Sequence, residues 1–267
     1  MPTSTSCAAS AAPSCRGTTI EAAGARATIA ANDRKGRRQL IRAWISTHRA
    51  GEQMARHRHA EAYAALVLAG GYVEAGDSGR VRVLPGQVLI HGAHQAHRDQ
   101  FSDVGAVVLN IPWFDRFDVA TGSVADPDAI ARLAEQDATG AALLLRETLT
   151  PVDAQLAEWP DKLAAALACS ADFRLDNWAE TMGLAPQSVS RGFRRAYGVS
   201  PKRYRVEQRA LRAIGHLPTW RGTLAALAAE SGFADQAHLA RAVVALTGRT
   251  PFQLKVKSVQ EGARASR

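Results

Sequence analysis

A repeat of about 50 residues in the C-terminal third constrains the fold of this 267-residue chain more than any other feature. The segments GLAPQSVSRGFRRAYGVSP, which begins at Gly183, and GFADQAHLARAVVALTGRTP, which begins at Gly232, end in the same Gly-x-x-Pro pattern. Pro201 and Pro251 are 50 positions apart, whereas the two starting glycines are 49 apart. The chain therefore contains a duplicated unit whose copies differ by one residue in a turn.

Each copy of the repeat predicts a helix, a tight turn and a second helix. Gly183 and Gly232 each follow a run of helical periodicity, where a helix ends in the left-handed conformation that glycine adopts without strain. Pro186 suits the first turn of the next helix in one copy, and Asp235 suits the N-cap in the other. Apolar residues then recur at helical spacing: Val189, Phe193 and Tyr197, and in the second copy Leu239, Val243 and Leu246. A pair of helices with a polar outer face is typical of a helix-turn-helix unit.

The polar faces of the two second helices supply the candidate DNA-binding residues. Arginine can read guanine with two hydrogen bonds, and glutamine can read adenine in the same way. We predict DNA contacts from ten residues: Gln187, Ser188, Ser190, Arg191, Arg194, Arg195, Gln236, Ala237, His238 and Arg241.

The distribution of charge is an independent indication of a polyanionic partner. Residues 171–267 contain 16 Lys and Arg against 7 Asp and Glu, whereas residues 1–170 contain 17 against 18. The whole positive excess therefore lies in the C-terminal part, which favours binding to double-stranded DNA. Basic helices that only keep a domain soluble are the alternative, and two repeats in phase argue against it.

Residues 160–258 resemble the DNA-binding domain of the AraC/XylS family of bacterial transcription regulators. The resemblance is strongest in AAESGFADQAHLARA and TGRTP of the second copy. It implies two helix-turn-helix units joined by a long helix, which here would be Pro201–His216, with Tyr204, Ala210 and Ile214 facing inward.

The second unit departs from this family pattern at its end. Val243 and Val244 stand where the family usually has Phe followed by Lys or Arg, and FQL replaces an aromatic residue followed by Arg. We therefore expect fewer phosphate contacts from the second unit than from the first.

The segment from 38 to 120 has a different periodicity, because short apolar stretches are separated by Gly and Pro. This pattern predicts a β-sandwich or barrel. GEQMARHRHAEAYAALVLAG (51–70) and LPGQVLIHGAHQAHRD (84–99) resemble the two motifs of a cupin barrel. The resemblance implies that His57, His59 and His97 stand at the positions of the family's metal-ligating histidines. Residues two apart in a strand share a face, so His57 and His59 can point into the barrel together.

The fourth cupin ligand, a glutamate, would stand at position 63, where this chain has Tyr63. Glu61 is displaced by two residues along the strand. Three histidines can still ligate zinc, nickel or iron, so a divalent metal at His57, His59 and His97 stays an alternative. We favour a pocket that binds a small-molecule effector through His57, His59, Tyr63 and His97, with no resident cofactor.

Two further histidines, His91 and His94, form a His-x-x-His-x-x-His run with His97. Such a run scatters over different faces of a strand and a turn, so we expect His91 and His94 to be structural or to lie at the rim.

The remaining segments are expected to connect or flank these two domains. Residues 1–35, rich in Ala, Ser, Thr and Gly, predict a disordered arm, and residues 259–267 a flexible tail. Residues 123–159 predict a helical connector, in a region of helical periodicity that extends from 126 to 169. These helices either cover the barrel's own sheet or mediate dimerisation, and both interpretations stay open.

The sequence as a whole predicts an α+β multidomain protein: a cupin-like β-barrel (jelly roll) at 36–122 and an all-α double helix-turn-helix domain at 160–258. The expected function is a non-enzymatic transcription regulator that responds to a small molecule, with double-stranded DNA, a second copy of the chain and RNA polymerase as partners. A metal-dependent cupin enzyme or a metal sensor fused to a DNA-binding domain is the alternative. An odd number of cysteines and the lack of a signal sequence or membrane span favour the cytoplasm.

Overall fold

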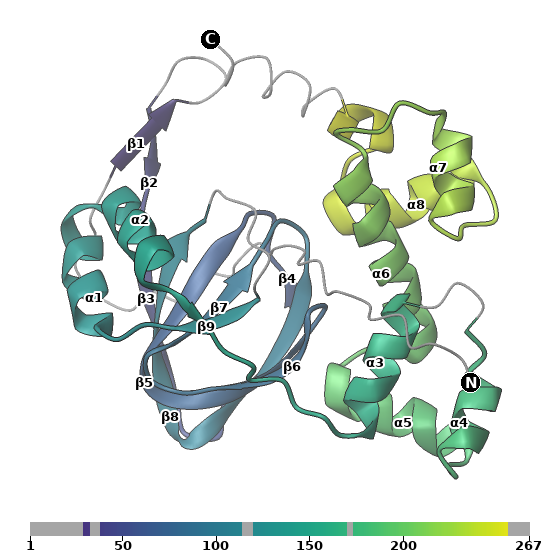
Figure 1. Cartoon of the computed structure of the whole chain (residues 1–267), viewed down its shortest axis with the longest axis horizontal. Helices are drawn as coiled ribbons and strands as arrows, with labels where there is room; N and C mark the ends of the chain where they lie inside the picture. Colours follow the sequence, from purple (N-terminus) through teal and green to yellow (C-terminus); the bar gives the residue numbers. More distant parts are fainter. Residues whose placement is uncertain (1–28, 33–37, 114–119, 170–172, 256–267) are drawn as a thin grey trace. The chain divides into compact units, whose positions relative to one another are not determined.

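The computed structural model describes residues 29–32, 38–113, 120–169 and 173–255. The chain divides into two compact units, Met1–Leu156 and Ala157–Arg267, and each is described by itself (Figure 1). The described elements of the first unit are strands and two helices, whereas those of the second unit are all helices. No described helix is long and apolar enough to cross a membrane.

The described strands of the first unit belong to two antiparallel sheets. The smaller sheet pairs β1 (Ile29–Asn32) with β2 (Arg38–Ile41). The larger, eight-stranded sheet contains β3 (Trp44–His48), β4 (Gln53–Arg58), β5 (Tyr63–Gly76), β6 (Gly79–Val83), β7 (Gln87–His91), β8 (Ala96–Pro112), β9 (Thr121–Ser123) and β10 (Thr150–Pro151). Strands expected between 38 and 120 are therefore present, and they pair in an antiparallel sheet. Within the predicted arm the structure describes β1, and the rest of the arm and the predicted tail lie outside the described residues.

Strands β5 and β8 are the two long central strands of the larger sheet, and they pair antiparallel along their whole lengths. The strand β7 pairs with the first half of β5 and β6 with its second half, while β3 and β4 pair with the two halves of β8. Two register shifts interrupt β5, between Val67 and Ala69 and between Gly70 and Tyr72. A Cβ at Gly70 would lie 2.0 Å from the carbonyl oxygen of Gly105, so this close crossing requires glycine. The larger sheet is strongly curved (Figure 1), and irregularities of this kind bend a strand.

The two faces of the curled sheet bury different cores. Its inner face carries Tyr63, Ala65 and Val67 from β5. They form one hydrophobic cluster with seven further buried residues: Tyr72, Val81, Val83, Leu89, Phe101, Ala106 and Val108. Ala64 and Leu66 point the opposite way, as alternation in a strand requires. They pack on the outer face against two helices.

Those helices are α1 (Pro127–Gln136) and α2 (Ala138–Thr148). Ile130 and Leu145 are completely buried among the residues of the outer face, and Asp126 and Asp137 cap the two helices through their side chains. The expectation that helices cover the barrel's own sheet agrees with this packing, and dimerisation stays a prediction.

The prediction of helix continuing from 126 to 169 is wrong between the end of α2 and Trp159. Thr150 and Pro151 instead form β10, which pairs with β9, and Gln155 bridges to Val81 of β6. Pro151 lacks the N–H that a helix needs and restricts Thr150 to extended conformations. The chain therefore leaves the helical conformation after α2 and contacts the sheet again at β10 and at Gln155.

The second unit consists of six helices within the described residues: α3 (Trp159–Cys169), α4 (Leu175–Thr181), α5 (Pro186–Tyr197), α6 (Pro201–His216), α7 (Leu224–Glu230) and α8 (Gln236–Thr247). The predicted linker Pro201–His216 coincides with α6. Gly183 and Gly232 have φ of +65° and +76°, so both turns are left-handed as predicted. Asp235 caps α8 by accepting a hydrogen bond of 2.6 Å from the backbone N–H of His238.

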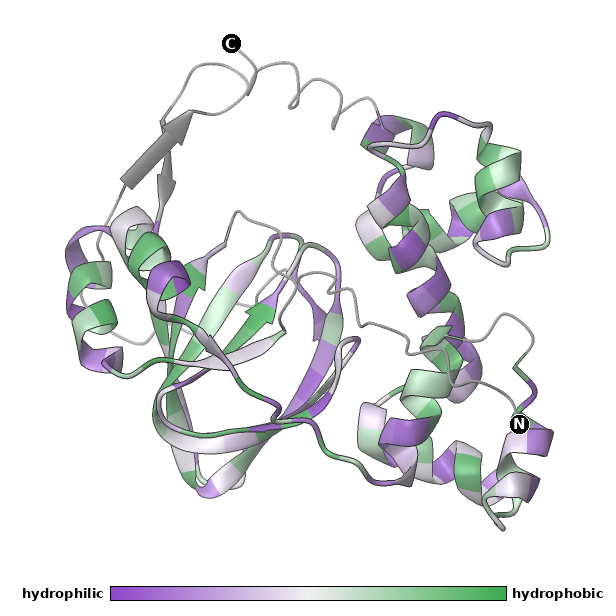
Figure 2. Cartoon of the chain, viewed as in Figure 1, coloured by the Kyte–Doolittle hydropathy of each residue, from purple (hydrophilic) through white to green (hydrophobic). Residues whose placement is uncertain are grey.

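Each half of the second unit has its own core around α6. Tyr204 packs edge-on against Phe193 and Tyr197, with ring centroids 5.4 Å away in both pairs. Leu239 and Val243 are completely buried with residues of the other end of α6, while Ile214 and Leu246 are half-buried. Hydrophobic and hydrophilic residues both occur along α6 (Figure 2).

Arginines of α6 also tie the other helices in place. Arg209 Nη1 donates a hydrogen bond of 2.7 Å to the carbonyl oxygen of Gly232, and Arg205 Nη1 donates one of 2.9 Å to the carbonyl oxygen of Phe173. Arg212 donates to the carbonyl of Ala168 at the end of α3. Part of the positive charge on α6 therefore serves the fold.

Candidate functional site

The first candidate site is the polar face of α5. Because Val189, Phe193 and Tyr197 face the core, the predicted contact residues are directed away from it. Five of them are exposed: Gln187, Ser188, Arg191, Arg194 and Arg195. Ser190 is half-buried. The first helix-turn-helix unit, α4–α5, thus presents three arginines on one helix.

The equivalent face of α8 carries less charge. Gln236, Ala237 and Arg241 are exposed, and His238 is half-buried with its ring edge-on to Phe233 at 5.0 Å. Val244, which stands 50 positions after Arg194, is 41% exposed. The second unit, α7–α8, therefore presents an apolar side chain where the first presents an arginine.

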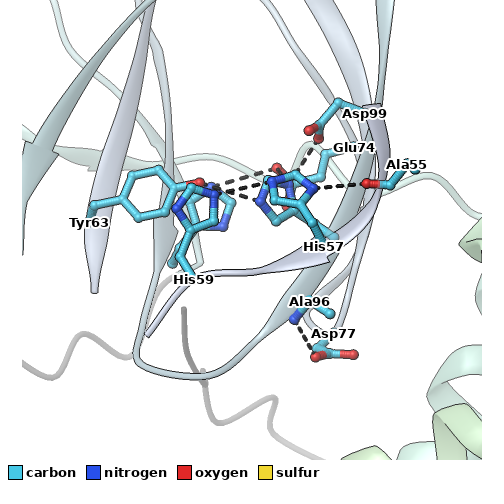
Figure 3. Close-up of polar contacts among 10 residues, drawn as sticks. Ala55, His57, His59, Tyr63, Glu74, Asp77, Ala96 and Asp99 are labelled. Carbon is cyan, nitrogen blue, oxygen red and sulfur yellow. Dashed lines mark hydrogen bonds and ion pairs between the residues drawn. The ribbon is translucent and has the colours of Figure 1, made fainter. Parts of the chain in front are cut away.

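The second candidate site is a cluster of polar side chains on the inner face of the sheet, for which we use the name histidine cluster. It consists of His57, His59, Tyr63, Glu74, His91, His97 and Asp99. Cross-strand pairing brings most of its members together, because three pairs are opposite each other in register: His57 with His97, Tyr63 with His91, and Glu74 with Asp99. Figure 3 shows the side chains of His57, His59, Tyr63 and Glu74 converging.

The three histidines predicted as a set do lie together. The Nε2 atoms of His57 and His59 are 3.1 Å apart, and the ring of His97 is centred 4.3 Å from that of His57. One ring nitrogen of each lies within 4.8 Å of the others. His57 Nδ1 is 2.9 Å from the carbonyl oxygen of Ala55, which fixes the orientation of this ring.

Tyr63 also joins this set, as predicted for the effector site. Its hydroxyl oxygen lies 3.4 Å from Nε2 of His97, and its ring is centred 5.0 Å from that of His59. All four residues assigned to the effector site therefore meet on the inner face of the sheet.

His91 does not lie at the rim, which was one of the two positions expected for it, while a structural role stays a prediction. Its side chain is 3% exposed, and its Nε2 lies 3.6 Å from Oε2 of Glu74. His94 does lie in a turn, half-buried with φ of +86°, and its carbonyl accepts a hydrogen bond from Arg58. Glu61 is exposed and lies outside the histidine cluster.

Glu74 and Asp99 were missed by the sequence-based prediction. Glu74 Oε2 lies 3.1 Å from His97 Nδ1, and Asp99 Oδ1 lies 3.0 Å from the same nitrogen. The register shifts in β5 change which alternate residues face inward, so Tyr63 and Glu74 share a face although their numbers differ by an odd count. For Glu74, the sequence did contain one signal of a functional role, namely a carboxylate inside the otherwise apolar strand β5.

The electrostatics separate His97 from its neighbours. Burial, together with the charge on His97, lowers the pKa of His57 and lowers that of His59 to about 3. Burial also lowers the pKa of His91 to about 4. Burial disfavours the charged form of His97 as well, but the carboxylates of Asp99 and Glu74 outweigh it and hold its pKa well above the usual value. His97 is therefore the charged imidazole of the cluster.

The residues present fit the divalent metal that the cupin resemblance implies. Neutral His57 and His59 offer Nε2 lone pairs, and Asp99 holds Nδ1 of His97, the arrangement in which a carboxylate orients a ligating imidazole. A metal held by His57, His59 and His97 would supply a Lewis acid to which an oxygen or nitrogen group of a small molecule could bind.

The family-model match to known proteins falls in the second unit. Residues 178–255 match the family model described as a helix-turn-helix domain, whereas no curated protein sequence matches the chain. An AraC-type transcriptional regulator from Chromobacterium violaceum is 20% identical over 37% of this chain and 88% of that one, with a TM-score of 0.34. The C-terminal domain of AraT, a response regulator from Geobacillus stearothermophilus, is 19% identical over 37% and 80%, with a TM-score of 0.33. ToxT from Vibrio cholerae, solved with an unsaturated fatty acid, is 8% identical over 79% and 94%, with a TM-score of 0.37. The family match and the paired helices of the second unit identify residues 178–255 as a helix-turn-helix domain.

Proposed function

We propose that this protein is a DNA-binding transcription regulator of the AraC type, in which the second unit binds duplex DNA and the histidine cluster binds a small-molecule effector. The observation that carries the proposal is the pair of helix-turn-helix units on α6, each with an exposed polar face on its second helix. The match to the helix-turn-helix family model supports it.

Two recognition helices on one linker suit two stretches of major groove on the same side of the duplex. Successive major-groove faces are separated by one helical turn, about 10 bp. Arg191 of α5 and Arg241 of α8 occupy equivalent positions of the repeat and are both exposed. They are the residues that we assign to base reading, while Arg194 and Arg195 are assigned to phosphates.

The sensory part of the proposal rests on the composition of the histidine cluster. His57 and His59 are half-buried, so they remain accessible to a ligand, whereas His97 behind them is buried. An effector regulates DNA binding only if it prefers one conformation of the protein over another. The proposed effector is therefore a polar molecule that His57, His59 and Tyr63 contact directly.

Selection of binding sites from a pool of random duplexes, with the purified full chain, tests the DNA-binding proposal. The enriched duplex is then titrated at increasing salt by fluorescence anisotropy. The logarithm of the affinity should fall linearly with that of the salt concentration, with a slope of about −0.9 per neutralised phosphate. No enriched sequence, or equal affinity for selected and random duplexes at every salt concentration, would show that the protein is not a sequence-specific regulator.

The sensory proposal is tested separately by a thermal-shift screen of small polar compounds. A compound that stabilises the wild-type chain should not stabilise the His57→Ala/His59→Ala variant, and should change the affinity of the wild type for its selected duplex. Stabilisation that survives in the double variant would place the effector elsewhere.

A further inference from the structure

The innermost part of the histidine cluster has features that neither DNA binding nor the effector explains. Glu74, His91 and His97 each offer one ligand atom, these atoms lie within 4.8 Å of one another, and all three side chains are buried. This set shares His97 with the three-histidine set but otherwise uses different residues on different strands.

Two polar atoms of this inner set make no hydrogen bond. Glu74 Oε2 and His91 Nε2 are both buried and make no hydrogen bond among the described residues, although Glu74 Oε2 lies within ion-pair distance of His97. Both side chains are 3% exposed. A buried polar atom without a hydrogen bond is unfavourable and rare in native proteins, and a bound group that contacts both atoms would satisfy them.

The separations suit a metal ion as that group. Glu74 Oε2 lies 3.6 Å from His91 Nε2 and 3.1 Å from His97 Nδ1. Ligands about 2.0–2.1 Å from a tetrahedral zinc ion are themselves about 3.4 Å apart. The observed distances lie on both sides of this value, so small shifts of the side chains would complete the site.

The surroundings hold the three ligands in place. Tyr63 stacks on His91 with ring centroids 4.4 Å apart, which fixes the plane of that imidazole. A Cβ at Gly76 would lie 3.1 Å from Glu74 Oε1 and 3.2 Å from His97 Cβ, so glycine leaves room for both side chains. A second buried carboxylate, Asp99, adds negative charge beside His97, and a divalent cation would compensate the two carboxylates in place of the proton that His97 carries without metal.

We propose that Glu74, His91 and His97 form a buried site for a late first-row divalent metal such as Zn²⁺, beneath the half-buried residues that contact the effector. The missing carboxylate at position 63 argued against a metal, and Glu74 supplies a carboxylate from another part of β5. The ligand set of two imidazoles and one carboxylate, open to a further ligand, is one that zinc accepts. This site deepens the sensory proposal and does not rest on DNA binding.

The experiment measures Zn²⁺ binding to the full chain after chelator treatment, by competition with a chromophoric chelator and by elemental analysis after dialysis. Wild type should hold one equivalent. Glu74→Gln and His91→Phe should each weaken binding more than 100-fold, beyond the 10- to 100-fold effect of residues that only support a ligand. The His57→Ala/His59→Ala variant should keep its equivalent with nearly unchanged affinity.

Two outcomes overturn the proposal: no tight Zn²⁺ binding by the wild type, or binding that survives Glu74→Gln and His91→Phe but is lost in the double variant. The second outcome would assign the metal to the three-histidine set. Circular dichroism and thermal unfolding of the metal-free variants show whether each one folds, and Glu74→Asp, which keeps the carboxylate, should retain measurable binding. Titration of the same preparations with the selected duplex separates failure of this site from failure of the DNA-binding proposal.

Discussion

Tyr63 and His91 are cross-strand partners whose rings stack at a centroid distance of 4.4 Å with an interplanar angle of 20°. Tyr63 stands where a glutamate would be expected from the cupin resemblance, and its ring covers a histidine that the sequence did not single out as functional. This pairing connects the core of the sheet to the histidine cluster, so a substitution at Tyr63 affects both stability and binding.

We expect Tyr63→Ala to lower the free energy of unfolding of the first unit by about 3–5 kcal/mol, because it removes a buried aromatic ring. Tyr63→Phe, the matched control, keeps the ring and loses only the hydroxyl beside His97, so it should cost about 1 kcal/mol. Urea unfolding measures both. Equal losses for the two variants would show that the hydroxyl, rather than the ring, stabilises the sheet.

The pKa of His91 predicts a pH-dependent stability for the metal-free protein. Folding lowers this pKa from 6.5 to about 4, so below pH 6.5 the unfolded chain binds a proton that the folded protein does not bind. The stability that this histidine contributes is present above pH 6.5 and is lost as the pH falls toward 4. Between pH 6.5 and pH 5, wild type should lose about 1–2 kcal/mol relative to His91→Phe. Urea unfolding in the presence of a chelator measures this difference, and parallel pH profiles would contradict it.

Arg191→Ala and Arg241→Ala should each weaken binding to the selected duplex by about 1–3 kcal/mol and relax base preference at one position. Arg194→Ala should instead weaken binding to all sequences alike. Arg132→Ala, which removes the same charge from the first unit, is the control for net charge. If Arg241→Ala left affinity and preference unchanged, the second unit would have no role in base reading.

Val244 allows the opposite change, because it is 41% exposed at the position equivalent to Arg194. Val244→Arg should raise affinity for random and selected duplexes alike and steepen the salt dependence by about one phosphate contact. Val244→Gln is the uncharged control. An unchanged slope would show that the end of α8 does not approach the DNA backbone.

Arg209 should matter for folding rather than for direct DNA contact. Arg209→Met removes a charged donor from the carbonyl oxygen of Gly232, and should lower the free energy of unfolding of the second unit by about 1.5–3 kcal/mol. Lys202→Met, at an exposed position of the same helix, should change it by less than about 0.5 kcal/mol. Thermal unfolding followed by the helical circular dichroism signal at 222 nm tests both.

Local sequence patterns alone determined most of the second unit. The left-handed glycines at 183 and 232 and the cap at Asp235 were predictable, because caps and turns depend on residues a few positions apart. The resemblance to a known family added the linker Pro201–His216. Alternation within one strand likewise placed His57 and His59 together, and the resemblance to a known family added His97.

Only the tertiary structure decided the features that depend on pairing between distant strands. The register shifts in β5 turned Glu74 toward His97, and the pairing of β5 with β7 placed His91 against Tyr63, although neither relationship follows from local spacing. The partner of the extended segment after α2 is likewise set by long-range pairing with β9, although Pro151 already disfavours a helix there. A helix forms bonds within itself, whereas a strand's inward face and neighbours are set by distant residues. The inner carboxylate and His91 therefore emerged only from the folded sheet.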